Sequence, residues 1–226
     1  MVKYRKRGTD MLEKMADFFE KRLDEYDTHM LDCIESAREF YPFTAASLPV
    51  HSGTRILDLG CGTGLELEEY LRLNPSARIT GIDLSRGMLD ALSDKLGEGN
   101  IELICGSYFD VPFGECQFDA AVSVESLHHF TFDEKIPLYK KLRASLSDGG
   151  YFILTDYFAS SDAEESALRK ELIRLKKEEG ITDKDFYHFD TPLTVAHEIE
   201  ALIAAGFGSV TELSSWGATH TLKAEK

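Results

Sequence analysis

The sequence of 226 residues has few cysteines and no long hydrophobic run. Its four cysteines, Cys33, Cys61, Cys105 and Cys116, lack the spacing of metal ligands and are too few for a disulfide framework in a chain of this size. We therefore expect reduced thiols and no metal site. No apolar stretch is long enough to span a bilayer, and no apolar segment follows the basic residues 1–7 as in a secretory signal. These absences predict a soluble, cytoplasmic protein with no membrane partner.

Positive charge is also scarce. The chain carries 25 Lys and Arg against 40 Asp and Glu, a net charge of −15, and its densest basic run is residues 1–7. Proteins that bind a phosphate backbone do so with clusters of Lys and Arg, so a nucleic-acid partner is disfavoured and the acidity is typical of a solvated surface. The length and a hydrophobic content of 43% suit one domain with a small appendage. The oligomeric state is left open, a homodimer included.

What the chain does have is a strand, a glycine turn and a helix in succession over residues 55–73. The apolar run 56–59 predicts a buried strand, and apolar residues at helical spacing over 65–73 predict a helix. Between them, glycines stand at positions 60, 62 and 64, where the missing Cβ lets a ligand lie against the main chain. The free N–H groups of the following helix point at that ligand. This succession is the first unit of a nucleotide-binding α/β fold.

The spacing of these glycines favours a ligand without phosphates. It is Gly-x-Gly-x-Gly rather than the dinucleotide pattern Gly-x-Gly-x-x-Gly. Asp58 precedes the turn by two residues, and its carboxylate would repel a diphosphate but attract an ammonium group. A second predicted strand, 79–84, ends at Asp83, where an acid binds ribose hydroxyls. A cationic amino end, a ribose and no phosphate together describe S-adenosylmethionine.

The two segments 58–64 and 81–85 resemble the class I S-adenosylmethionine-dependent methyltransferase family, and the likeness extends from about Leu48 to the C-terminus. The resemblance implies an α/β fold with a Rossmann-like, doubly wound, seven-stranded, mostly parallel sheet, an antiparallel C-terminal hairpin and an N-terminal helical cap. We expect a lid segment at 1–47, a methyltransferase domain at 48–226 and a helical insertion at about 158–191. The residues that the resemblance assigns to S-adenosylmethionine are Asp58, Gly60, Cys61, Gly62, Gly64, Asp83, Leu84, Ser107, Tyr108, Glu125 and Tyr26. Ser107 departs from the family, which commonly has an acid there to accept the adenine amino group.

Hydrophobic periodicity predicts the remaining elements. Two helices are expected over residues 10–40, with one more helical turn between Pro42 and Pro49. Ser85 is the expected N-cap of a helix to Leu96, and Asp148–Gly150 the stop signal of another. The other predicted strands are 101–105, 118–124, 151–155, 209–213 and 218–223, and the other predicted helices are 133–146, 161–179 and 194–205.

Methyl transfer from a sulfonium depends chiefly on placement, so a base is needed only where the acceptor carries a proton of high pKa. For that role the sequence offers His128 and His129 after the fourth strand, then His188 and Tyr187 on the insertion. The expected acceptor pocket adds Tyr26, Tyr157 and Phe189, and suits a small or medium organic molecule. The same side chains would equally serve to pack the insertion or cap the sheet.

Three other functions stay open at this point. The first is a non-catalytic subunit that binds the cofactor. The second is an enzyme that transfers another group from the cofactor, and the third is a nicotinamide-dependent dehydrogenase. The glycine spacing and Asp58 disfavour the last. The sequence does not choose between oxygen, nitrogen, sulfur and carbon as the acceptor atom.

Overall fold

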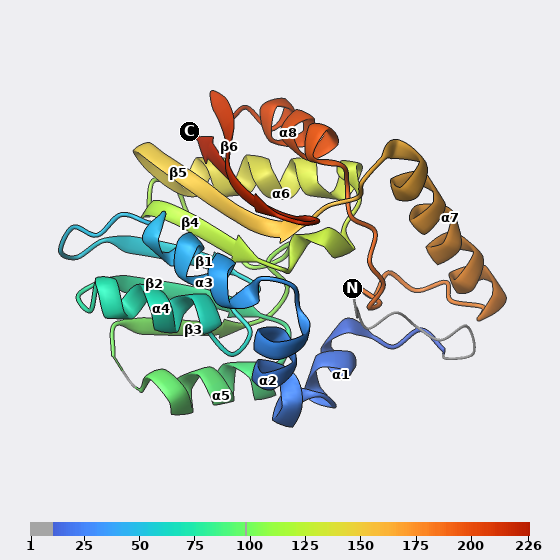
Figure 1. Ribbon diagram of the computed structural model, residues 1–226, viewed down its shortest axis with the longest axis horizontal. Helices are drawn as coiled ribbons and strands as arrows, with labels where there is room; N and C mark the ends of the chain where they lie inside the picture. The colour runs from blue at the N-terminus through green and yellow to red at the C-terminus, as the bar shows by residue number, and fades with distance from the viewer. Residues whose placement is uncertain (1–10, 98) are drawn as a thin grey trace.

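The computed structural model describes residues 11–97 and 99–226, and a seven-stranded sheet forms its centre (Figure 1). The strand order is β3-β2-β1-β4-β5-β7-β6. The first five strands pair in parallel, while β7 runs antiparallel between β5 and β6. This confirms the predicted fold class. The strands are β1 Arg55–Leu59, β2 Arg78–Asp83, β3 Ile101–Cys105, β4 Phe118–Val124, β5 Leu146–Tyr157, β6 Ser209–Trp216 and β7 Thr219–Glu225.

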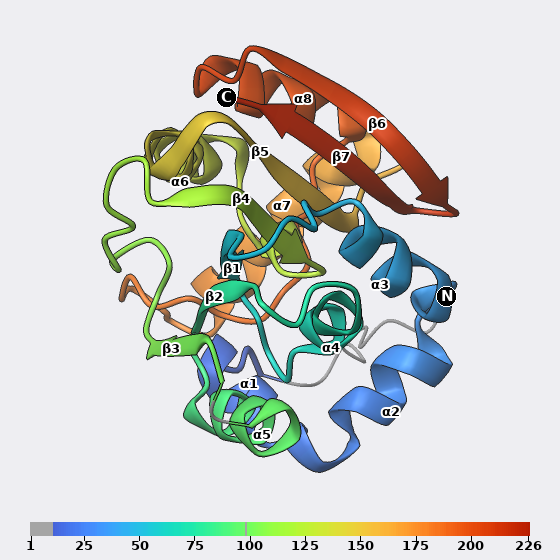
Figure 2. The same ribbon diagram turned by 90° about the vertical axis from the view of Figure 1, so that its left-hand side faces the viewer.

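Helices cover both faces of the sheet, as Figure 2 shows in side view. Helices α3, α4 and α5 lie on one face, and α6 and α8 lie on the other. Helices α1 and α2 lie beyond the carboxyl ends of the parallel strands, and α7 projects from the same end (Figure 1). The bounds are α1 Met15–Glu20, α2 Leu23–Cys33, α3 Ala37–Ala46, α4 Leu65–Leu73, α5 Arg86–Leu96, α6 Phe132–Ser145, α7 Asp162–Glu178 and α8 Val195–Ala204, with a short 3-10 turn at Leu127–His129.

Strand β4 shows why its sequence is almost continuously apolar. Ala120 and Val122 pack into the core beneath α3 and α4, whereas Ala121 packs into the core beneath α6 and α8. A strand buried on both faces has no solvent side on which to place polar residues. The strand therefore delivers the segment after Val124 to the end of the sheet from within the core.

Side-chain caps set several helix starts. The Ser85 hydroxyl accepts a hydrogen bond from the Met88 amide at 3.2 Å, which confirms the predicted N-cap of α5. Thr131 and Glu134 form a capping box at the start of α6. Both devices satisfy amide groups that the first helical turn leaves without partners.

The segment before the sheet differs from its prediction. The sequence predicted two helices and one further turn between Pro42 and Pro49, but three helices precede β1 and Pro42 lies inside α3. A proline within a helix costs about 3 kcal/mol. Phe40 and Ala45, on either side of Pro42, are fully buried, and their burial offsets that cost.

Strand β5 also begins earlier than predicted. We expected Asp148–Gly150 to end a helix and the strand to start at Tyr151, but the strand starts at Leu146 opposite Phe118. The pairing then shifts, so that Tyr151 stands opposite Ala120 and residues 147–150 bulge. Gly149, with φ +76°, makes the turn that the bulge requires.

Two features bear on the expected organisation. Helix α3 shares a buried cluster with α4, while α7 contributes no buried residue. The division at residue 47 and the insertion at about 158–191 stay predictions, and the basic segment 1–7 lies outside the described residues. No helix within 11–97 and 99–226 combines the length and apolarity that crossing a membrane requires.

Candidate active site

The glycine turn after β1 has no room for a side chain at Gly60 or Gly64. Gly60, Gly62 and Gly64 all have positive φ values, between 48° and 77°. A Cβ on Gly60 would lie 2.1 Å from the Ser126 hydroxyl oxygen, and one on Gly81 would lie 2.8 Å from the Cys61 sulfur. The amides of Gly60 and Cys61 both donate to the Ile82 carbonyl, at 2.8 and 3.2 Å. The turn is therefore held tightly between β2 and the segment after β4.

Asp83, at the end of β2, is tied to the turn by its carboxylate. One oxygen accepts from the Gly62 amide at 2.9 Å, and the other accepts from the Ser85 amide at 2.8 Å. Burial raises the pKa of Asp83, while these amide hydrogen bonds oppose the rise. Each oxygen keeps a second lone pair, which suits the ribose hydroxyls predicted for this acid. Leu84 follows it, partly buried against the core.

Asp58 is fully buried, and its carboxyl has no partner among the described residues other than the Glu66 carboxyl beside it. Burial and the neighbouring carboxyl of Glu66 raise the pKa of Asp58 well above its usual range. Burial likewise raises the pKa of Glu66, at the start of α4, to about 7. Two buried carboxyls side by side are costly once ionised, and a cationic group would supply the countercharge that Asp58 lacks. The site therefore fits the ammonium group of S-adenosylmethionine at Asp58.

Helix α2 packs over the glycine turn. The ring of Tyr26 lies 3.9 Å from the place where a Cβ on Gly62 would stand. Burial, followed by the charge of Asp83, raises the pKa of Tyr26 above its usual value, which keeps its hydroxyl protonated. The Asp27 carboxylate pairs with the Thr63 hydroxyl and the Lys95 ammonium. The N-terminal segment thus reaches the turn as predicted, and the cofactor contact of Tyr26 stays a prediction.

The loop after β3 is organised by Lys141. Its ammonium group donates to the carbonyls of Tyr108, Phe109 and Val111 at 2.6–2.9 Å. The Ser107 hydroxyl accepts from the Phe109 amide at 3.2 Å, so it partly stabilises its own turn. The Tyr108 ring is buried, and its hydroxyl lies 3.3 Å from that of Ser126, beside Gly60. This places the predicted adenine loop next to the glycine turn.

A pocket lies at the carboxyl end of the sheet, between helices α1 and α2 and the segments that follow β4 and β5. Strand ends, the N-terminal helices and the segment after α7 all contribute side chains. Of the residues predicted for the site, Tyr26, Glu125, His128, His129, Tyr157 and His188 line it. Glu125 adopts φ +48° and accepts from the Thr219 hydroxyl at 3.1 Å. The pocket therefore corresponds mainly to the predicted acceptor side. Of the residues predicted for the cofactor, only Tyr26 and Glu125 are among the described residues that line it.

Two neighbouring histidines on its wall have opposite protonation tendencies. His128 Nδ1 lies 2.6 Å from Asp156 Oδ1, and His128 Nε2 lies 3.6 Å from Asp190 Oδ1. Burial alone would lower the pKa of His128, but Asp156 and Asp190 raise it to about 10. Burial and the positive charge of His128 hold the pKa of His129 well below its usual value. His128 is therefore an imidazolium at neutral pH and His129 a neutral imidazole.

His188 also lines the pocket, with its ring centroid 5.0 Å from that of His129. Its ring stacks on Phe18 of α1, with centroids 3.4 Å apart and an interplanar angle of 6°. Burial lowers the pKa of His188 to about 4, so it too is neutral. Tyr157, at the end of β5, is buried and packs edge-on against His128.

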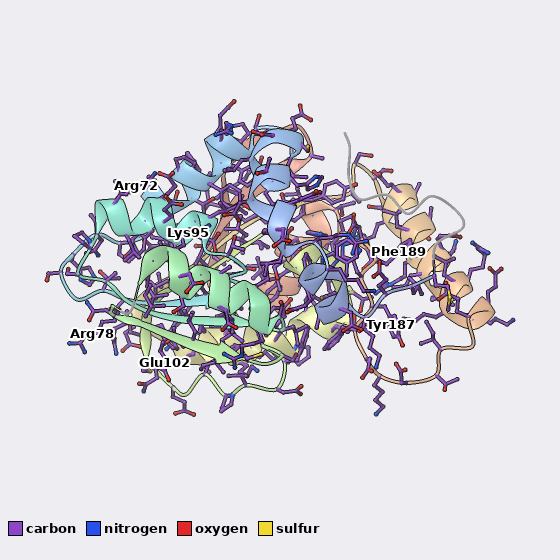
Figure 3. All side chains as sticks on the ribbon, turned by 90° about the horizontal axis from the view of Figure 1, so that it is seen from below. Arg72, Arg78, Lys95, Glu102, Tyr187 and Phe189 are labelled. Carbon is purple, nitrogen blue, oxygen red and sulfur yellow. The ribbon has the colours of Figure 1, made fainter. Side chains whose placement is uncertain are left out.

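Tyr187 and Phe189 lie elsewhere. The Tyr187 hydroxyl donates to Asp183 at 3.0 Å, and its backbone bridges to Lys14. Phe189 offers its carbonyl to His129 Nδ1 at 3.3 Å. Figure 3 labels both on the side of the molecule where α7 lies, opposite Arg72 and Arg78. Neither is among the described residues that line the pocket, and their substrate role stays a prediction.

Several residues of the site escaped the sequence reasoning. Asp156 ends a strand, as Asp83 does, and the same rule would have found it. Glu66 looked like part of an acidic helix surface but is buried. Asp190 and Trp216 carry no local signal, because only the folding of distant segments brings them to the pocket.

The chain is similar to known methyltransferases. Residues 56–150 match the family model described as a methyltransferase domain. A sterol 24-C-methyltransferase from Gibberella zeae is 26% identical over 174 residues, which is 73% of this chain and 42% of that protein. A fatty-acid O-methyltransferase from Mycolicibacterium smegmatis is 33% identical over 119 residues, 52% of this chain and 42% of that one. The chain thus matches less than half the length of these two relatives.

Among solved structures, human N-acetylserotonin methyltransferase in complex with S-adenosylmethionine superimposes with a TM-score of 0.61. It is 18% identical, with 93% of this chain and 55% of that one covered, and the likeness shows the fold. Residues 56–150 thus match a methyltransferase domain, and the sheet order and glycine turn are those of the class I S-adenosylmethionine-dependent methyltransferase family.

Proposed function

We propose that the protein is an enzyme that transfers the methyl group of S-adenosylmethionine to a small or medium organic molecule. The observation that carries this proposal is the buried carboxyl of Asp58, which has only the Glu66 carboxyl as a partner among the described residues and lies behind the glycine turn. A cation at that point would relieve the cost of burying Asp58 and the neighbouring Glu66. A dinucleotide would instead bring a diphosphate to the same carboxyls and be repelled.

The chain's own residues would hold the nucleoside at three points. Asp83 would accept from the ribose hydroxyls, and Asp58 would bind the ammonium group. Tyr108, whose ring is fixed beside Gly60 through Ser126, would lie against the base. When bound, the cofactor supplies an electrophilic methyl group on a positively charged sulfur.

The pocket suits an acceptor with an apolar body. Phe18, Phe19, Met30 and Trp216 line it, and charged groups gather near His128. The sterol and fatty-acid methyltransferases among the relatives support the same class of acceptor. Holding the acceptor in line with the methyl group can by itself lower the activation barrier of the transfer by about 7–11 kcal/mol. An acceptor lone pair would form the new bond to carbon while the carbon–sulfur bond breaks and its electrons remain on sulfur.

His128 and His129 stay the predicted catalytic residues. As an imidazolium, His128 would orient an electronegative group of the acceptor, whereas the neutral His129 would take a proton from it. The protein is also proposed to act without nucleic acid or membrane partners, in keeping with its net charge of −15.

A transfer assay tests this proposal. Purified protein would be incubated with S-adenosylmethionine labelled in the methyl group and a panel of hydroxylated and carboxylated apolar molecules. We expect label in at least one acceptor, and its loss in the Asp83→Ala variant, because ribose hydroxyls lose a charged acceptor. Cofactor binding without transfer to any member of the panel or of a metabolite extract would instead favour a non-catalytic binding subunit. Transfer of a group other than methyl would assign the protein to another reaction on the same cofactor.

A further inference from the structure

We propose that His128, His129 and Asp190 form a binding site for a divalent transition-metal ion, of which Zn²⁺ is the best match. One donor atom from each of the three lies within 4.8 Å of the other two. Two residues come from the turn after β4, and Asp190 comes from the segment after α7. The sequence offered no spacing for such a site, because the third donor is more than 60 residues from the others.

The donor separations match those of a four-coordinate ion. Asp190 Oδ1 lies 3.6 Å from His128 Nε2 and 3.4 Å from His129 Nδ1. Zinc binds nitrogen and oxygen at about 2.0–2.2 Å, so two ligands of a tetrahedral ion lie about 3.3–3.5 Å apart. Small shifts of these side chains would therefore suffice. Two imidazoles and one carboxylate also form a donor set that Zn²⁺ and Fe²⁺ favour over Mg²⁺ or Ca²⁺.

Asp156 gives the site its outer support. Its Oδ1 lies 2.6 Å from His128 Nδ1, and its Oδ2 accepts from the Leu127 amide at 2.8 Å. A histidine that binds a metal through one nitrogen commonly donates its other N–H to a carboxylate, which fixes the ring and strengthens the ligand. This contact leaves Nε2 as the nitrogen directed at Asp190. It also favours this cluster over the alternative grouping of Glu125, His128 and Asp156, in which Nδ1 would have to be the ligand.

His129 Nδ1 is shared between two acceptors in the structure, Asp190 Oδ1 at 3.4 Å and the Phe189 carbonyl at 3.3 Å. An ion would take the place of the hydrogen on that nitrogen, and the ring proton would reside on Nε2. Metal ligation would therefore exclude His129 as the proton acceptor of the reaction. It would also displace the Nε2 proton of His128, so that His128 could not act as an imidazolium while the ion is bound. A measurement of metal binding therefore distinguishes the role of His129 as a metal ligand from its role as a proton acceptor.

Three protein ligands leave a coordination position open, and all three ligands line the pocket. Catalytic zinc sites have this arrangement, whereas structural sites are closed by a fourth side chain. The open position would bind an oxygen of the acceptor and so favour acceptors with a hydroxyl or carboxyl group. This consequence rests on the proposed function; the metal site itself does not.

The first test is metal binding by the full-length protein, with no cofactor or acceptor present. Chelator-treated protein would be titrated with Zn²⁺ by calorimetry and with Co²⁺ by visible absorption, which reports the coordination number. We expect one saturable equivalent per chain and the intense bands of a four-coordinate Co²⁺ ion. Asp190→Asn and His128→Asn should each weaken binding at least tenfold, and Asp156→Asn should weaken it by about 10–100-fold through the ring it orients.

His197→Asn is the matched control. His197 Nδ1 also lies 2.8 Å from a carboxylate, that of Glu165, but on a more exposed part of the surface. This variant should bind Zn²⁺ as the unmodified protein does. Binding that is absent from the unmodified protein, or that persists in both Asp190→Asn and His128→Asn, would overturn the proposal.

X-ray absorption at the zinc edge keeps the test decisive if those variants fail to fold. The unmodified protein should show nitrogen and oxygen neighbours only, with the scattering pattern of two imidazoles. Sulfur neighbours would place the ion on the free thiols of Cys33, Cys61, Cys105 or Cys116 and contradict the site. These measurements do not depend on any reaction. If the protein binds metal at this site but transfers no methyl group, the proposed function is refuted and the metal site stands.

Discussion

The carboxyl groups of Asp58 and Glu66 are buried as neighbours behind the glycine turn, and Asp58 has no partner other than Glu66 among the described residues. The fold thus maintains two acids in a place where their charged forms are unfavourable. Such an arrangement favours binding of a cation but lowers the stability of the folded protein when no cation is bound. Two of the predictions below follow from it.

The first prediction concerns pH. Burial raises the pKa of Glu66 from 4.5 to about 7. Between these values the unfolded chain has lost the Glu66 proton while the folded protein keeps it, so the free energy of unfolding falls as pH rises. Thermal melts of the cofactor-free protein should therefore show a steeper loss of stability from pH 5 to pH 8 than melts of Glu66→Gln. Equal slopes for the two proteins would show that Glu66 ionises normally in the fold.

The second prediction concerns Asp58→Asn, which should raise the melting temperature of the empty protein while weakening its affinity for S-adenosylhomocysteine. The substitution removes a buried ionisable group, which stabilises the empty protein. It also removes the negative charge that would bind the ammonium group, which weakens the affinity. A loss of about 10–100-fold in affinity corresponds to about 1.4–3 kcal/mol, the worth of a charge-assisted hydrogen bond. Asp94→Asn, on the exposed side of α5, is the control and should change neither quantity. An Asp58→Asn protein that binds as tightly as the unmodified one would remove the charge argument.

The third prediction separates backbone strain from steric exclusion. Gly53 and Gly60 have similar φ values, 72° and 76°, but a Cβ on Gly53 meets nothing within 4 Å. Gly53→Ala should therefore cost only the strain of a left-handed residue, about 1–2 kcal/mol. Gly60→Ala adds the overlap with Ser126 and should cost more, with loss of nucleoside binding. Urea unfolding and calorimetry would measure the two effects, and equal costs for both variants would show that Ser126 moves aside freely.

The fourth prediction concerns a buried ion pair between α6 and α8. The Lys135 ammonium and the Tyr139 hydroxyl both donate to the Glu198 carboxylate, and both charged side chains are 1% exposed. Lys135→Met leaves a buried unpaired carboxylate and should cost about 3–5 kcal/mol of stability. Replacing all three groups, as Lys135→Met, Glu198→Leu and Tyr139→Phe together, should recover most of that loss. A triple variant less stable than Lys135→Met would show that the network contributes net stability.

Local sequence patterns predicted most of the sheet and its glycine turn, because both depend on short-range features. A strand such as β4 and the N-cap Ser85 are visible within a few residues. Pro42 was misplaced because the burial of Phe40 and Ala45 decides that helix, and burial depends on the tertiary fold. The shifted start of β5 likewise depends on its pairing with β4.

The residues of the site also fall into those that local sequence predicts and those that only the tertiary fold brings together. Asp58 and Asp83 stand beside strand ends and were predicted from that position. Asp190 meets His128 only because the segment after α7 folds back across the end of the sheet, as the hydrogen bond from the Thr191 amide to the His128 carbonyl records. Spacing in the chain carries no information on such a contact. Tyr187 and Phe189 were chosen because their aromatic segment could fold over the end of the sheet, but of the run 186–189 only His188 lines the pocket, and Phe189 reaches His129 through its carbonyl.

The central claim is that the glycine turn holds a cationic, phosphate-free nucleoside. Calorimetric titration of the full-length protein with S-adenosylhomocysteine, and separately with NAD, tests it most directly. We expect one site per chain for S-adenosylhomocysteine, abolished by Gly60→Val, and no binding of NAD. Tight binding of NAD with none of S-adenosylhomocysteine, or nucleoside binding that survives Gly60→Val, would contradict it.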